Sequence, residues 1–149
     1  MKKKEKEKAT TDSWGILPVT GDSVTKAMDF LLTDHQMQQI AMGHIPDAME
    51  DHWFMYCDDQ YIRYYRSWTG RCAFIAKYKK INSGYKICEL TIPDDDLRKK
   101  GAENINFDAL SMMFLSLLMD ECGGDSEYYW KKYRELKEMQ QGISELKNN

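Results

Sequence analysis

The sequence predicts an α+β protein in which a four-stranded antiparallel meander, over about residues 51–92, packs against N-terminal and C-terminal helices. Three observations lead to this class. Residues 51–92 alternate in polarity, are rich in Trp, Tyr, Phe and Ile, and contain three turn signals. Apolar residues at helical spacing precede this region, and an almost wholly apolar segment over 107–119 follows it. Strands grouped between helices indicate α+β rather than alternating α/β architecture.

Two helices are expected before the sheet. In "DSVTKAMDFLLTDH" (22–35), apolar residues recur at helical spacing behind an Asp/Ser cap, namely Val24, Ala27, Met28, Leu31 and Leu32. This pattern predicts an amphipathic helix. A second, shorter helix is expected from about His35 to Met42, because Gly43 is a typical residue after a helix C-terminus.

The turn signals predict a register for the meander. A two-residue turn at 58–59 would place Trp53 opposite Tyr64 and Asp51 opposite Arg66. A two-residue turn at Thr69-Gly70 and a four-residue loop "INSG" would then set the remaining pairs, which are Tyr65 with Phe74 and Ile75 with Leu90.

Because side chains alternate along a strand, this register sorts the sheet into two faces. One face is an expected core under helix 107–119, and it collects Trp53, Met55, Ile62, Tyr64, Ala73, Ile75, Cys88, Leu90 and Ile92. The other face is aromatic and collects His52, Phe54, Tyr56, Tyr61, Arg63, Tyr65, Phe74 and Tyr78. Three interpretations of the aromatic face stay open: a terminal helix covers it, it forms a dimer interface, or it is a platform that stacks bases.

The C-terminal third is expected to be helical. "FDALSMMFLSLLM" (107–119) is apolar almost all round and predicts a buried helix, which Gly123-Gly124 ends. A long final helix is expected over 125–147, with one apolar side formed by Tyr129, Tyr133, Leu136, Ile143 and Leu146.

Charge and length exclude several classes of protein. The net charge is −3, yet "MKKKEKEK" alone carries +3, so the other residues carry −6. Residues 1–12 are expected to be a disordered basic tail before a single domain over 13–149. An acidic domain is not expected to bind duplex DNA. No apolar run reaches the roughly 18–20 residues of a spanning helix, and no signal-peptide core follows the lysines, which favours a cytoplasmic protein without a membrane partner.

Metal and cofactor chemistry find no support in the sequence. The four cysteines form no C-x-x-C pair, and the three histidines form no H-E-x-x-H pattern. Neither G-x-x-x-x-G-K nor G-x-G-x-x-G is present. We therefore expect reduced thiols, no metal site and no cofactor.

Charged, hydroxyl and aromatic side chains gather at one edge of the expected sheet. "MED" precedes the first strand and "RSWTG" ends the second, so the predicted register brings both to the same edge. Arginine binds phosphate, an indole stacks on a base, and a carboxylate accepts hydrogen bonds from ribose hydroxyls. The predicted ligand-binding residues are Glu50, Asp51, Trp53, Arg66, Ser67, Trp68 and Thr69. The alternative is structural: a tight hairpin, with Asp51 and Arg66 as an ion pair that locks two strands.

The block "MEDHWFMYCDDQYIRYYRSWTGRCAFIAKY" (49–78) resembles a segment of small, uncharacterised bacterial and phage proteins that carry "MED-x-W-F-x-Y" followed by "R-S-W-T-G-x-C". The resemblance covers about residues 45–80. Such proteins sometimes accompany ADP-ribosyl-glycohydrolase-type modules, so the resemblance implies a context in NAD-derived or ADP-ribose metabolism. The matching positions are Glu50, Asp51, Trp53, Arg66, Ser67, Trp68, Thr69 and Gly70.

Three functions stand as hypotheses. The first is a small binding module that recognises a nucleotide-type ligand, such as ADP-ribose or a related NAD-derived molecule, at the sheet edge. The second is a hydrolase that cleaves an N-glycosidic or phosphoester bond with Glu50 or Asp51 as acid or base. The third is a protein-interaction or homodimerisation module that uses the aromatic sheet face or the final helix.

Overall fold

Five strands and two helices make up most of the described chain, which comprises residues 7–19, 21–93, 107–123, 131 and 134–135 of this computed structural model. They are β1 (Ser23–Leu32), α1 (Asp34–Ala41), β2 (Trp53–Cys57), β3 (Tyr61–Arg66), β4 (Cys72–Ile81), β5 (Gly84–Pro93) and α2 (Phe107–Cys122). Residues 94–106 and the final helix expected over 125–147 lie outside the described residues, apart from Lys131, Arg134 and Glu135. No helix of the described part is long and apolar enough to cross a membrane.

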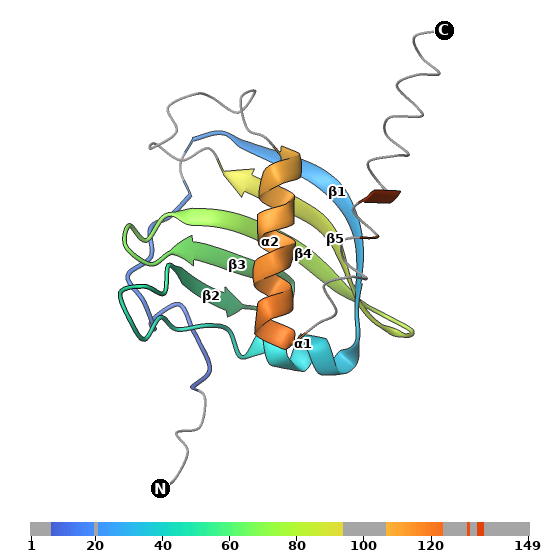
Figure 1. Cartoon of the computed structure of the whole chain (residues 1–149), viewed down its shortest axis with the longest axis horizontal. Coiled ribbons are helices and arrows are strands. Elements are labelled where there is room, and N and C mark those ends of the chain that lie inside the picture. Colours follow the sequence, from blue (N-terminus) through green and yellow to red (C-terminus); the bar gives the residue numbers. More distant parts are fainter. Residues whose placement is uncertain (1–6, 20, 94–106, 124–130, 132–133, 136–149) are drawn as a thin grey trace, which may run out of the picture.

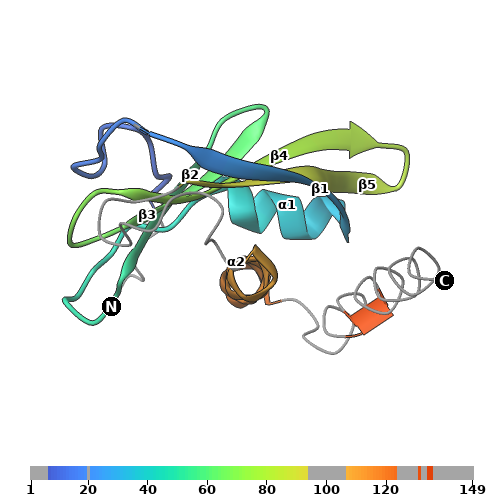
Figure 2. The same cartoon turned by 90° about the horizontal axis from the view of Figure 1, so that it is seen from above.

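The strands form one antiparallel sheet in the order β1-β5-β4-β3-β2. Strands β2 to β5 are the meander that the sequence predicts, and β1 adds a fifth strand beside β5. α2 crosses one face of the sheet, and α1 lies on the same side of the sheet as α2 (Figures 1 and 2). The α+β class with an antiparallel sheet is therefore confirmed, with five strands rather than four.

The amphipathic helix expected over 22–35 is wrong, because this segment forms β1 and the start of α1. Exposure alternates toward the end of the strand: Phe30 and Leu32 are buried, whereas Leu31 between them is exposed. Neighbouring apolar residues such as Leu31-Leu32 fit a helical period and a strand period equally well. Pairing with β5 decides between them, since a helix here would leave the backbone groups along that edge of β5 without their β1 partners.

α1 confirms the second predicted helix and begins at Asp34. The Thr33 hydroxyl accepts a hydrogen bond from the Gln36 amide at 3.0 Å, and the Gln36 side chain accepts one from the Thr33 amide at 2.9 Å. This reciprocal pair is a capping box. Gly43 follows the helix with φ +75°, and a Cβ there would lie 2.5 Å from the Met55 carbonyl oxygen, so the position requires glycine.

The β2–β3 hairpin has a longer connection than predicted. The Asp58 carboxylate accepts hydrogen bonds from the amides of Gln60 and Tyr61 at 2.8 and 2.7 Å and thereby holds the loop. The extra length moves the register by two residues, so Arg66 pairs with Trp53. The prediction that Asp51 lies opposite Arg66 is therefore wrong, although each residue of the two strands keeps its predicted face.

A β-bulge between Tyr64 and Tyr65 changes the faces of β4. Phe74 pairs with Tyr64 and lies in the core, whereas Ile75 packs on the opposite face. The prediction had these two residues the other way round, because a slip of one residue exchanges the faces of a strand.

The β4–β5 hairpin closes more tightly than the four-residue loop that the sequence predicts. Ile81 pairs with Gly84, which leaves two residues in the loop, and Ile75 pairs with Thr91 rather than Leu90. A second bulge, after Lys77, brings Ile87 into the core and leaves the predicted core residue Cys88 partly exposed.

α2 covers the core face of the sheet, as the sequence predicts. Phe114 and Leu118 have no exposed surface and pack with Ile62 and Leu90 of the sheet. The ring of Phe114 meets that of Tyr64 edge-on, with ring centroids 5.9 Å apart. The main hydrophobic core therefore lies between α2 and β1–β5.

The opposite face is covered in part by the N-terminal segment, which is extended rather than helical. Trp14 stacks on Phe54 with ring centroids 6.2 Å apart and an interplanar angle of 18°. Ala9 is 2% exposed, and its amide donates to the Met42 carbonyl at 2.8 Å, although it belongs to the segment that the sequence predicts to be a tail. The aromatic side chains Phe54 and Tyr65 are thus core residues of a second, smaller cluster.

Candidate functional site

The segments before β2 and after β3 meet, as the sequence predicts. The Ser67 hydroxyl donates to the Asp51 carbonyl at 2.9 Å, and the Ser67 amide donates to the His52 carbonyl at 2.9 Å. The Trp68 indole N–H donates to the Met49 carbonyl at 3.0 Å. These hydrogen bonds join residues 49–53 to residues 66–70, and we call the combined surface the Trp68 edge.

A third segment, which the sequence reasoning missed, completes this edge. The Trp14 indole N–H donates to the Ser67 carbonyl at 2.9 Å, and the Leu17 amide donates to the Gly70 carbonyl at 2.9 Å. Gly70 has φ +73°, and a Cβ at this position would lie 2.3 Å from the Gly15 carbonyl oxygen. Glycine is required here both by the backbone conformation and by the close approach of the N-terminal segment.

Arg66 packs on an aromatic ring across the hairpin. Its guanidinium carbon lies 5.3 Å from the centroid of the Trp53 ring, which is the geometry of a cation–π contact. Trp53 is half-buried, and it also packs edge-on against Tyr64 at a centroid separation of 6.1 Å. The structure thus places two of the predicted site residues, Trp53 and Arg66, in contact on the α2 side of the hairpin.

Asp51 is held by a histidine that the sequence reasoning did not select. Nε2 of His44 lies 2.5 Å from Oδ2 of Asp51, and Nδ1 of His44 lies 3.3 Å from Oε2 of Glu121 at the end of α2. The hydrogen bond from Glu121 raises the pKa of His44 most; burial opposes this, Asp51 adds to it, and the pKa reaches about 9. His44 is therefore an imidazolium at neutral pH, bridging two carboxylates from different elements.

Nothing in the sequence signals this triad of His44, Asp51 and Glu121. The residues lie seven and seventy-seven positions apart along the chain, and their meeting depends on how α2 crosses the sheet. The isolated bridge between His44 and Met55 fixes the histidine backbone next to β2.

Half of the ten residues of the Trp68 edge are exposed, namely Met49, Glu50, His52, Trp68 and Thr69. Trp68 is 69% exposed and Met49 is 75% exposed, although both are large apolar side chains. The Trp68 ring also packs at an angle against the His52 ring, with ring centroids 5.9 Å apart. Glu50 and Thr69 are exposed, and the Thr69 hydroxyl accepts the Arg71 amide at 3.2 Å. The edge therefore presents a fixed indole whose N–H group is already hydrogen bonded within the protein.

The arrangement does not favour the acid–base chemistry proposed for Asp51. A general base needs a carboxylate that can take a proton from a substrate, whereas this one accepts a hydrogen bond from a positively charged imidazole. Cysteine nucleophiles are disfavoured as well, because burial raises the pKa of Cys57 and of Cys72 to about 12. Among the described residues, no group of three or more His, Cys, Asp or Glu side chains could hold a metal ion.

Comparisons with protein-family models, with curated proteins and with solved structures gave no match to this chain. The fold and the Trp68 edge therefore define the class in structural terms: a sheet covered by helices, with one end of a hairpin presenting an exposed aromatic ring.

Proposed function

We propose that the protein is a binding module that recognises a nucleotide-type ligand, such as ADP-ribose or a related NAD-derived molecule, at the Trp68 edge without reacting with it. One observation carries the proposal: the Trp68 ring is 69% exposed, and its N–H group is held by the Met49 carbonyl at 3.0 Å. A ring held in this way is a ready stacking surface for a planar base.

Neighbouring residues supply what else such a ligand needs. The cation of Arg66, positioned over Trp53, would attract a phosphate, and the exposed carboxylate of Glu50 would accept hydrogen bonds from ribose hydroxyls. The Ser67 hydroxyl joins the two segments by donating to the Asp51 carbonyl, and the Asp51 carboxylate is paired with His44. The division of roles is therefore between residues that hold the edge together and residues that face the ligand.

Calorimetric titration with ADP-ribose, NAD and cyclic nucleotides tests this proposal. Stacking on an aromatic side chain contributes about 1–3 kcal/mol per base, so Trp68→Ala should weaken binding by roughly 5- to 150-fold. Trp68→Phe keeps a ring and should retain most of the affinity. The control is Met113→Ala, which removes an exposed apolar side chain from α2 instead. Absence of binding heat for the wild-type protein with every compound would make the proposal wrong.

A second candidate function is a protein interaction, and the exposure of Met49 beside Trp68 favours it. Exposed large apolar side chains in a rigid setting are typical of interface hot spots. Light scattering over a range of concentrations would reveal a homodimer, and Trp68→Ala should then return the protein to a monomer. A monomer at every concentration removes the homodimer form of this candidate.

The hydrolase alternative is separated from binding by product analysis. The same compounds are incubated with the protein and examined by chromatography. If a reaction occurs, Glu50→Gln should abolish turnover and spare binding, since Glu50 is the exposed carboxylate of the edge whereas Asp51 is paired with His44.

A further inference from the structure

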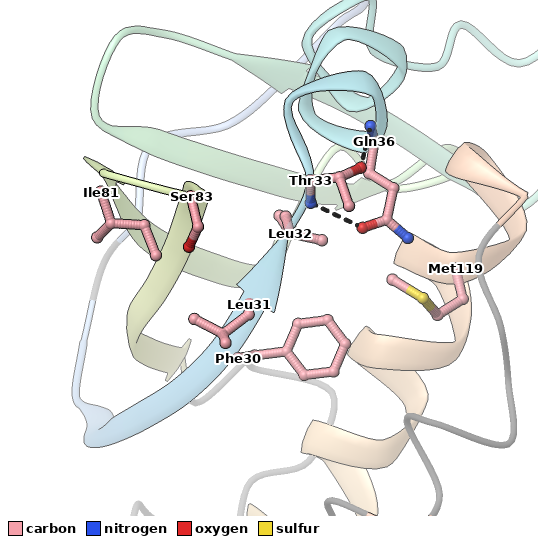
Figure 3. Close-up of a pocket in the computed structure, with 8 residues that line it drawn as sticks. All are labelled: Phe30, Leu31, Leu32, Thr33, Gln36, Ile81, Ser83 and Met119. Atoms are coloured by element: carbon pink, nitrogen blue, oxygen red, sulfur yellow. Dashed lines mark hydrogen bonds between the residues drawn. The ribbon is translucent and has the colours of Figure 1, made fainter.

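A pocket lies at the other end of the sheet from the Trp68 edge. It has a volume of about 360 Å³ and sits between the end of β1, the start of α1, the β4–β5 turn and α2 (Figure 3). Its apolar walls are Phe30, Leu31, Leu32, Ile81 and Met119. β4 separates the two sites, and its ten residues span about 30 Å at ordinary strand rise.

Three polar residues line the pocket, Thr33, Gln36 and Ser83, and the first two are hydrogen-bonded to each other. The Thr33 hydroxyl and amide and the Gln36 amide and side-chain oxygen form the capping box of α1. A ligand in the pocket would thus find apolar contact and little directional hydrogen bonding. Leu31, which is 42% exposed on the pocket wall, adds apolar surface at the mouth.

The chain leaves α2 next to this pocket. Met119 lines the pocket, and α2 ends only three residues later at Cys122. Gly123 follows with φ +63°, a left-handed conformation that ends a helix and turns the chain. Everything after residue 123 therefore starts within a few residues of the pocket wall.

Three described residues of the C-terminal segment show which side of it faces water. Lys131, Arg134 and Glu135 are helical and exposed. In the final helix that the sequence predicts over 125–147, at about 100° per residue, Tyr129, Tyr133 and Leu136 fall on the side opposite to these three positions.

We propose that the pocket is the docking site of this chain's own C-terminal segment, whose apolar side at Tyr129, Tyr133 and Leu136 packs on the wall formed by Phe30, Leu31 and Met119. The pocket wall is mainly apolar, so it offers a surface against which the apolar side of such a segment can be buried. This inference is independent of the function proposed for the Trp68 edge.

Hydrogen exchange on the full-length protein tests the proposal. Docking should slow amide exchange over residues 126–140 by about 10-fold or more relative to an unstructured chain. Leu31→Asp places a charge on the pocket wall and should remove most of that protection. Met113→Asp is the matched control, because Met113 is 43% exposed and Leu31 is 42% exposed, and Met113 does not line the pocket.

Each outcome decides the question. Fast exchange of 126–140 in the wild type, or slow exchange that Leu31→Asp leaves unchanged in a folded protein, overturns the proposal. Protection that disappears on dilution overturns it in favour of docking onto a second copy. Should Leu31→Asp fail to fold, Tyr133→Ser alters only the segment: loss of protection over 126–140 then supports the proposal, and retained protection overturns it.

Discussion

Nε2 of His44 lies 2.5 Å from Oδ2 of Asp51, so the segment between α1 and β2 is closed by a hydrogen bond between two of its own side chains. Glu121 adds a second carboxylate from α2, at 3.3 Å. This segment and α2 are thereby joined through one charged imidazole, and their stability should depend on its protonation.

This dependence has a definite sign. The pKa of His44 is raised from 6.5 to about 9 in the folded protein, so its contribution to stability is fully present below pH 6.5 and is lost as the pH rises to about 9. Because the side chain is partly exposed, we expect a loss of about 1–2 kcal/mol rather than the full value of the shift. Urea unfolding at pH 6, 7.5 and 9.5 measures it. In His44→Gln the dependence over this range should vanish, and an equal slope in both proteins would contradict the assignment.

Gly70 and Gly15 provide a matched pair. Gly70→Ala places a Cβ 2.3 Å from the Gly15 carbonyl oxygen and forces a left-handed φ on alanine, so we expect a loss of about 1–3 kcal/mol in the free energy of unfolding. Gly15→Ala meets no atom within 4 Å and should be close to neutral. Denaturant unfolding compares the two. Similar losses of unfolding free energy in the two variants would mean that the N-terminal segment does not pack closely against Gly70.

The hydroxyl of Tyr64 is buried and has no hydrogen-bond partner within the part of the chain that the structure describes. Burial raises the pKa of this phenol well above its usual value. Tyr64→Phe should therefore be neutral or should stabilise the protein by up to about 1 kcal/mol, because it removes a desolvated polar group and keeps the ring.

Tyr78→Phe is the control for that variant, since the Tyr78 hydroxyl donates to the Asp58 carbonyl at 2.5 Å. We expect it to cost about 0.5–1.5 kcal/mol. Thermal unfolding followed by circular dichroism ranks the two variants, and a larger cost for Tyr64→Phe than for Tyr78→Phe would show that the buried hydroxyl has a partner.

Cys57 and Cys72 should resist alkylation in the folded protein. Their pKa values of about 12 leave almost no thiolate at pH 8, and Cys72 is also buried from reagents. Iodoacetamide labelling followed by peptide mass spectrometry should show both as unmodified under native conditions and fully modified in guanidinium chloride. Rapid native labelling of Cys72 would indicate that the N-terminal segment opens readily.

The parts of the fold with strong local signals were predictable, and the parts set by distant contacts were not. The meander, α1 and α2 follow from turn residues, a glycine after the helix end and an almost wholly apolar segment. β1 was mistaken for a helix because its apolar doublets suit both periods, and only pairing with β5 distinguishes them. The two bulges change which side chains of β4 and β5 point to each face of the sheet, and the residue pattern contains no signal for them.

The candidate site was predictable in outline. Antiparallel pairing of β2 with β3 brings the segments at 49–53 and 66–70 together even though the register differs from the predicted one by two residues. The side-chain partners at this edge were not predictable. His44 contacts Asp51, Glu121 contacts His44, and Trp14 contacts Ser67, and each comes from another part of the chain without a recognisable sequence spacing.

The extended N-terminal segment has a practical consequence for anyone who trims this protein. A boundary placed at the first regular element, Ser23, would remove Trp14 from Phe54 and take away the hydrogen bonds to Ser67 and Gly70. Such a shortened protein would expose apolar aromatic rings on one face of the sheet and would be poorly soluble. That poor solubility could be mistaken for instability of the sheet itself.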